Sequence, residues 1–172
     1  MKADDLQFLG KYDMVVLDEA HTVEQVAGDH FGRSVSWSMI RFLLRDIYNP
    51  RTDRGILTLN NNADGIAEIN QAESAAEAFF QELSAYRGPE IAHNGRISKP
   101  VGITNVLSPA LTKLAAKLAD LRTASKSDEH GLELLTCENR AKEIASKLDE
   151  LITQAQPDHA YWVNSRNAYR GR

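Results

Sequence analysis

Two carboxylates and a histidine follow a short apolar run near the start of the 172-residue chain, where residues 14–21 read MVVLDEAH. Hydrolysis of a nucleotide needs a magnesium ion on the phosphates and a carboxylate that orients or deprotonates the attacking water. A rigid element must hold both groups in a fixed position. Asp18 and Glu19, directly after the apolar run, have the residue types and the place that this chemistry requires.

The neighbouring residues predict the elements that position this group. Residues 14–17 are too few for a helix and rich in β-branched side chains, which is typical of a strand buried on both faces of a parallel sheet. Thr22 and Gln25 match a capping box, in which the Thr22 hydroxyl accepts from the Gln25 amide, so a helix is expected to begin at Val23. Such a strand without sheet neighbours exposes both faces. We therefore expect it to be displaced, frayed or paired with residues 161–163.

The rest of the chain predicts helices. Ser34 or Ser36 can cap a helix that Asn49-Pro50 ends. An amphipathic stripe predicts a second helix over 63–87. Ser108-Pro109 is a typical helix start, with Ser108 as N-cap. The expected helices and connections are a helix over 109–126, a helix over 128–155, a brief extended segment over 56–59, a long exposed connection over 88–105 and a short strand over 159–163.

Apolar residues recur at spacings of four and three along 107–121 and 134–155, so these two helices are expected to form an antiparallel hairpin with 63–87 as a third partner. The basic side chains expected to meet the acidic 128–155 helix are Lys113, Lys117, Arg122 and Lys126. Cys137 lies on the apolar seam and is expected to behave as a small hydrophobic residue. The aromatic residues expected in the core are Trp37, Phe79, Phe80 and Trp162.

Composition narrows the possible functions. The net charge of −4 predicts that any nucleic-acid contact comes from a local patch. The single cysteine, Cys137, excludes a disulfide framework and a multi-cysteine metal or iron–sulfur site within these residues. Asp4-Asp5 interrupts any signal-peptide core, and no window approaches about 18 apolar residues. A soluble, cytoplasmic protein with no membrane partner is expected.

The Asp-Glu-Ala-His box after an apolar run resembles superfamily-two helicases, most closely the XPD/DinG-like group. In that family the Walker B strand of the motor is soon followed by a helical insertion, the Arch domain, and then by a strand that returns to the motor. The resemblance implies a mainly α fold: an antiparallel helical bundle or hairpin of Arch type with a small remnant of an α/β motor domain. The implied divisions are 1–33 for the motor fragment, 34–158 for the Arch-like domain and 159–172 for the return strand.

The same resemblance implies roles for individual residues. Asp18 would hold Mg²⁺, commonly through water, Glu19 would activate the hydrolytic water, and His21 would couple the ATP site to the nucleic-acid surface. ATP, Mg²⁺ and single-stranded DNA are thus the implied ligands, with 5′-to-3′ unwinding and the rest of the motor in cis. Thr22 departs from the Asn that many relatives carry, although its capping role preserves the helix start.

A phosphate loop ending in Gly-Lys-Thr or Gly-Lys-Ser is absent from the 172 residues. The chain alone is therefore expected to bind ATP poorly and not to hydrolyse it, as an excised piece of a longer helicase would. In the family, iron–sulfur cysteines fall before the Walker B box. A cluster in the parent is thus compatible with the lack of ligands here.

Other interpretations remain open. The two acids can be a solvated turn, and a metal hydrolase would use His21, Asp29 and His30, although no further ligand stands at recognised spacing. The alternative function is a free-standing helical protein-interaction module with an incidental DEAH sequence. Three arginines near the end of the chain are candidates for phosphate contact or simply a charged terminus, namely Arg166, Arg170 and Arg172.

Overall fold

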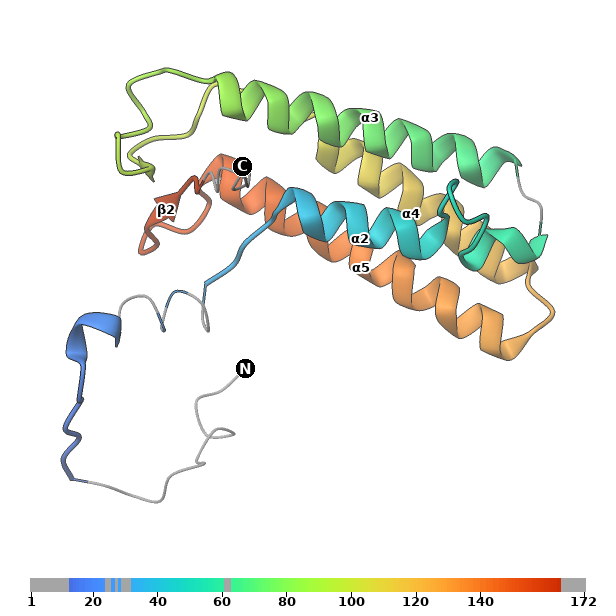
Figure 1. Cartoon of the computed structure of the whole chain (residues 1–172), viewed down its shortest axis with the longest axis horizontal. Coiled ribbons are helices and arrows are strands. Elements are labelled where there is room, and N and C mark those ends of the chain that lie inside the picture. Colours follow the sequence, from blue (N-terminus) through green and yellow to red (C-terminus); the bar gives the residue numbers. More distant parts are fainter. Residues whose placement is uncertain (1–12, 24–25, 27, 29–31, 61–62, 165–172) are drawn as a thin grey trace, which may run out of the picture. The chain divides into compact units, whose positions relative to one another are not determined.

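The computed structural model describes residues 13–23, 26, 28, 32–60 and 63–164. The chain divides into two compact units, Met1–Arg33 and Ser34–Arg172. The second unit contains all the long helices that the structure describes (Figure 1).

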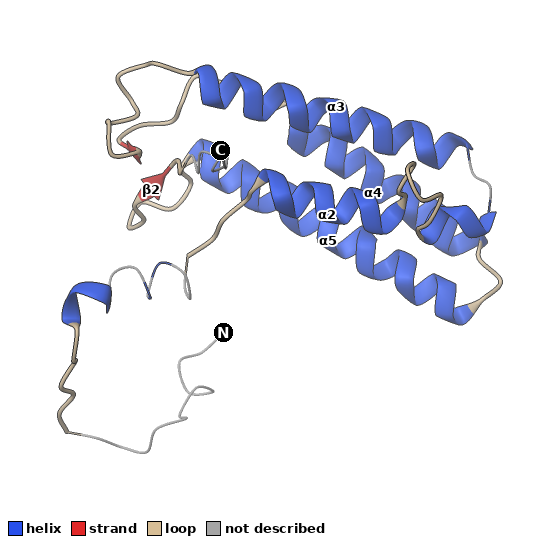
Figure 2. Ribbon diagram, in the orientation of Figure 1, coloured by secondary structure: helices blue, strands red, loops and turns tan. Residues whose placement is uncertain are grey.

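The second unit is an antiparallel bundle of α-helices (Figures 1 and 2). Its described helices are α2 (Trp37–Ile47), α3 (Ala63–Ala85), α4 (Leu107–Ala124) and α5 (Asp128–Thr153). α2 packs against α3 and α5, α3 packs against α4, and α4 packs against α5, so the contacts form a closed ring. Chain direction alternates from each helix to the next (Figure 1). The prediction of a mainly helical fold is confirmed, and α2 joins the three predicted partners as a fourth.

Hydrogen-bonding side chains fix where two of the helices begin. Ser36 is the N-cap of α2, and its hydroxyl accepts from the Met39 amide at 3.3 Å. Ser127 caps α5 by accepting from the His130 amide at 3.4 Å. Between the two serines offered by the sequence for α2, the structure therefore selects Ser36.

The start of α4 differs from the prediction. The side chain of Asn105, three residues earlier, accepts from the Ser108 amide at 3.0 Å and performs the capping role. The Ser108 hydroxyl is buried and donates to the Ala145 carbonyl of α5 at 3.0 Å. Ser108 as the N-cap is therefore wrong, because this hydroxyl links two helices instead.

Apolar stripes from all four described helices make the core. The largest fully buried side chains are Phe79, Ile40, Leu43, Ile47, Leu57, Leu107, Leu111, Leu114, Leu118 and Leu134. Cys137 is 3% exposed, as predicted for a small hydrophobic residue. Phe80 is half-buried and packs edge-to-face against Trp37 and Phe79, with ring centroids 5.8 and 5.3 Å away. Trp162, in contrast, is 54% exposed, so its assignment to the core is wrong.

Charged pairs connect the helices differently from the prediction. Arg122 pairs with Glu138 of α5 at 3.1 Å, as expected. Lys113 instead turns to α3, where it pairs with Glu68 at 3.1 Å and donates to Gln71 at 3.0 Å. α4 lies between two neighbours that both carry carboxylates, so Lys113 pairs with α3 and Arg122 pairs with α5.

The connections also depart from the prediction. The expected extended segment at 56–59 is a 3₁₀-helix, η3 (Ile56–Asn60), and its Leu57 is buried in the core. The 88–105 connection contains a short strand, β1 (Arg96–Ile97), that pairs antiparallel with β2 (Tyr161–Trp162). The predicted strand near the end of the chain therefore forms, but its partner is a segment that was expected to be loop. No helix among the described residues is both long and apolar enough to cross a membrane.

Candidate functional site

The apolar run of residues 14–17 belongs to no strand in the described part of the chain. All four side chains are exposed, with Val16 at 86%. A strand buried on both faces is therefore not formed by these residues, which agrees with the expectation that the run is displaced or frayed. The third expected outcome, pairing with residues 161–163, is not seen, and the strand described there, β2, pairs with β1. A β-type segment without a neighbouring strand leaves its backbone groups to water, which accounts for the exposed conformation.

Asp18, Glu19 and His21 are brought together by a tight turn after this run. The Glu19 amide donates to Asp18 Oδ1 at 2.9 Å, and His21 Nδ1 lies 3.1 Å from Glu19 Oε2. Thr22 closes the turn, because its amide and its hydroxyl both donate to the Glu19 carbonyl, at 2.8 and 2.9 Å. The 3₁₀-helix η2 (Ala20–Thr22) results.

Glu19 has a left-handed backbone conformation, with φ 51° and ψ 43°. A non-glycine residue there carries a cost of order 1 kcal/mol or more. The hydrogen bonds to its amide and carbonyl, together with the His21 contact to its carboxylate, offset that cost. The turn therefore orients the Glu19 side chain against the imidazole while both remain largely exposed, at 69% and 75%.

The donor set of this turn fits one position in a magnesium site. Mg²⁺ bound with a nucleotide uses one or two carboxylates, with phosphate oxygens and water as the remaining ligands. Asp18 is exposed and carries a carboxylate of this kind. No group of three or more His, Cys, Asp or Glu side chains in the described residues is arranged to hold a metal ion without such help.

Several residues singled out by the sequence lie outside the described part of the chain. These are Gln25 of the expected capping box, Asp29 and His30 of the metal-hydrolase alternative, and the arginines Arg166, Arg170 and Arg172. Val23, Val26 and Gly28 are helical where they are described, in agreement with a helix that begins at Val23.

No protein-family model, curated protein or solved structure matches the chain.

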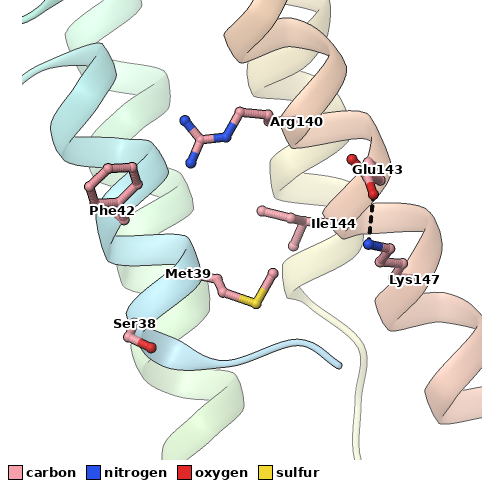
Figure 3. Close-up of a pocket in the computed structure, with 7 residues that line it drawn as sticks. All are labelled: Ser38, Met39, Phe42, Arg140, Glu143, Ile144 and Lys147. Atoms are coloured by element: carbon pink, nitrogen blue, oxygen red, sulfur yellow. Dashed lines mark ion pairs between the residues drawn. The ribbon is translucent and has the colours of Figure 1, made fainter. Parts of the chain in front are cut away.

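A second feature, missed by the sequence analysis, is a groove between α2 and α5 in the bundle unit (Figure 3). Its volume is about 390 Å³, and it is lined by Ser38, Met39, Phe42, Arg140, Glu143, Ile144 and Lys147. Phe42 is 60% exposed although it lies on a helix of the core. In the sequence, Phe42 lies between the core positions Ile40 and Leu43 but off their apolar stripe. This position could have predicted that its side chain is exposed.

Charged side chains border this groove in fixed pairs. Arg140 donates to Asp46 of α2 at 2.8 Å, and its guanidinium carbon lies 5.2 Å from the centroid of the Phe42 ring. Lys147 pairs with Glu143 at 2.6 Å, drawn as the dashed line in Figure 3. The hydrogen bond from Lys147 lowers the pKa of the Glu143 carboxyl. The groove thus has an apolar floor with charges that already have partners.

Proposed function

We propose that the chain supplies the Walker B segment and an Arch-like domain of an ATP-dependent DNA helicase similar to the XPD/DinG-like group. The observation that carries the proposal is the Asp-Glu-Ala-His box at 18–21, placed after an apolar run and followed by a helical domain. In the complete motor, the helical domain guides single-stranded DNA and ATP hydrolysis drives 5′-to-3′ translocation. The fragment of motor is small, at residues 1–33.

The turn geometry supports separate roles for the three polar residues of the box. Asp18 would hold Mg²⁺, which would supply positive charge to the nucleotide, and Glu19 would orient and deprotonate the attacking water. His21 Nδ1 lies 3.1 Å from the Glu19 carboxylate. In the proposal, His21 also contacts the nucleic-acid surface, so that DNA binding and the position of the catalytic base affect each other through this imidazole. Mg²⁺, when bound, neutralises charge on the phosphates.

The topology of the bundle supports an insertion. A bundle with an even number of alternating helices returns the chain to the end at which it entered. The start of α2 and the end of α5 therefore lie at the same end of the bundle (Figure 1). A domain of this form can be placed within a motor without separating the two strands that flank it.

Two observations test the proposal. The reading frame that encodes Met1 is expected to encode a phosphate loop upstream, and a second motor domain is expected after Arg172. The 172-residue chain by itself is expected to hydrolyse no ATP. A reading frame that lacks both the phosphate loop and the second motor domain would contradict the proposal.

The groove between α2 and α5 favours one alternative function, a free-standing helical module that binds another protein. Exposed Phe42 beside an apolar floor is a feature that protein interfaces use. A stop codon directly after Arg172 in the native gene would favour this alternative. Loss of ATP hydrolysis upon Glu19→Gln substitution in a longer protein would reject it.

A further inference from the structure

β1 and β2 present two different faces. Their register places Arg96 opposite Trp162 and Ile97 opposite Tyr161. Directly opposed residues of an antiparallel pair have neighbouring side chains on the same face. Ile97 and Tyr161 are half-buried, whereas Arg96 and Trp162 are exposed. The small sheet therefore holds a tryptophan and an arginine side by side on its solvent face.

The backbone around this pair is fixed by the sheet and its turn. Gly95 has φ +85°, and a Cβ there would lie 2.3 Å from the Val163 carbonyl oxygen. The Val163 amide donates to the Gly95 carbonyl at 2.8 Å, and Ile91 bridges to Ile97 on the other side of β1. The Tyr161 hydroxyl donates to the Gln156 carbonyl at 3.1 Å. The exposed indole thus stands on an ordered platform.

Both side chains are available to a ligand. Trp162 is 54% exposed, and Arg96 is exposed as well. An exposed indole stacks on nucleobases, and a neighbouring guanidinium binds phosphate or stacks on the next base. Exposed Lys99, three residues beyond Arg96, adds a second cation to the same connection.

The exposed basic side chains of the β1 connection, Arg96 and Lys99, favour an anionic partner. The whole chain has a net charge of −4, yet residues 159–172 contain three arginines and no acidic residue. An indole can stack on an unpaired base of any kind. The bases of a duplex are already stacked on each other, so this surface suits a single strand better than a duplex.

We propose that Trp162 and Arg96 form a contact surface for single-stranded DNA, in which a base stacks on the indole and the guanidinium binds the adjacent phosphate. The choice of DNA rests on the proposed helicase function, while the stacking and phosphate chemistry rest on the geometry of β1 and β2. The surface belongs to the bundle unit and is separate from the DEAH turn in sequence and in chemistry.

The direct test measures binding of the 172-residue chain to a fluorescein-labelled oligothymidylate of about 12 nucleotides by fluorescence anisotropy. Trp162→Ala is expected to weaken binding at least about fivefold, and Trp162→Phe to restore part of the affinity. Arg96→Ala is expected to lower the salt dependence, reducing the slope of log Kd against log salt by about 0.7.

Matched controls separate this surface from general effects. Leu132 is 65% exposed on α5, and Arg51 is exposed in the connection at the opposite end of the bundle. Leu132→Ala and Arg51→Ala are expected to bind like the wild type. Circular dichroism of every variant should retain the helical signal, because all four positions are exposed.

A second readout uses the intrinsic fluorescence of the indole. Trp37 and Trp162 are the two tryptophans of the chain, so Trp37→Phe leaves Trp162 as the single reporter. Oligothymidylate is expected to quench its emission. Equal affinity of the Trp162→Ala and Leu132→Ala proteins would overturn the inference, and so would a wild type that fails to bind at about 50 mM salt.

Two further binding measurements identify the type of nucleic acid that this surface binds. Tighter binding of oligouridylate or of duplex DNA than of oligothymidylate would overturn the assignment to single-stranded DNA. The proposed function fails on a different measurement, the hydrolysis of ATP by a longer protein with Glu19 substituted. Failure of the surface and failure of the helicase proposal are therefore distinguishable.

Discussion

Glu138 is a buried carboxylate of α5 that lies between two cations. Its side chain is 5% exposed, and it accepts from Lys142 at 2.7 Å and from Arg122 at 3.1 Å. The hydrogen bond from Lys142, and then that from Arg122, hold the pKa of this carboxyl below its ordinary value of 4.5, although burial opposes them. The ionised form is therefore favoured more in the folded protein than in the unfolded one.

We predict that Glu138→Gln lowers the free energy of unfolding by about 1–3 kcal/mol at neutral pH. Because the pKa of the folded state is depressed, this contribution is complete above about pH 4.5 and is lost as the pH falls through the folded-state pKa. Urea unfolding of both proteins at several pH values measures the difference. Glu129→Gln, at an exposed position of α5, is the control. A difference that grows as the pH falls would contradict the assignment.

Cys137 gives a second prediction at the same scale. Burial among apolar side chains raises the pKa of its thiol, so the reactive thiolate is scarcer at any given pH. A thiol reagent such as Ellman's reagent is expected to label native protein slowly at pH 8 and unfolded protein rapidly. Fast labelling of the native state, at the rate seen in denaturant, would show that the α4–α5 seam is open.

At the scale of elements, the cap of α2 distinguishes two serines that the sequence offers equally. Ser36 accepts from the Met39 amide, whereas Ser34 lies outside the helix and is exposed. We predict that Ser36→Ala costs about 1 kcal/mol of stability. Ser34→Ala is the matched control and should unfold like the wild type. The reverse order in urea unfolding would mean that α2 begins earlier.

The leucine seam gives a matched pair of core and surface substitutions. Leu114 is fully buried, and Leu132 is 65% exposed on the neighbouring helix. Leu114→Ala is expected to lower the free energy of unfolding by about 2–5 kcal/mol, since it removes apolar contacts and leaves a cavity. Leu132→Ala is expected to change it little. Comparable losses at both positions would contradict the packing of α4 against α5.

Local periodicity predicted the existence of the helices because each buries one stripe, and Ile40, Leu118 and Leu148 are all buried as their spacing requires. The sequence could not predict which neighbour a charge would choose. Lys113 turns to α3 because Glu68 is as suitable a partner as any acid on α5. Capping residues are equally ambiguous, since Asn105 and Ser108 both qualify locally and a contact with another helix decides between them.

The strands were the hardest elements to predict, for a related reason. A two-residue strand has almost no periodic signal, so Arg96–Ile97 looked like loop. An aromatic pair such as Tyr161–Trp162 predicts a strand, but only its pairing shows which face is covered. Trp162 was consequently expected in the core. The turn at 18–21 likewise depended on its hydrogen bonds, which no pattern of residue types specifies.

At the scale of the whole molecule, the two units are expected to differ in protection against hydrogen exchange. Residues 14–17 are exposed and belong to no strand, whereas the middle turns of α4 and α5 are hydrogen-bonded and buried on one face. The amides of residues 14–17 should exchange rapidly, and those in the middle of α4 and α5 should exchange slowly. Hydrogen–deuterium exchange followed by mass spectrometry measures both rates. Slow exchange across 14–17 in a monomer would indicate a strand partner and contradict the exposed conformation.

The central claim is that Glu19 serves ATP hydrolysis when the DEAH turn is joined to a phosphate loop. The decisive measurement is single-turnover ATP hydrolysis by a longer protein that contains both parts, with wild type, Glu19→Gln and the control Glu129→Gln compared. Glu19→Gln is predicted to abolish hydrolysis while nucleotide binding persists, and Glu129→Gln to hydrolyse ATP like the wild type. Undiminished hydrolysis by the Glu19→Gln protein would contradict the account.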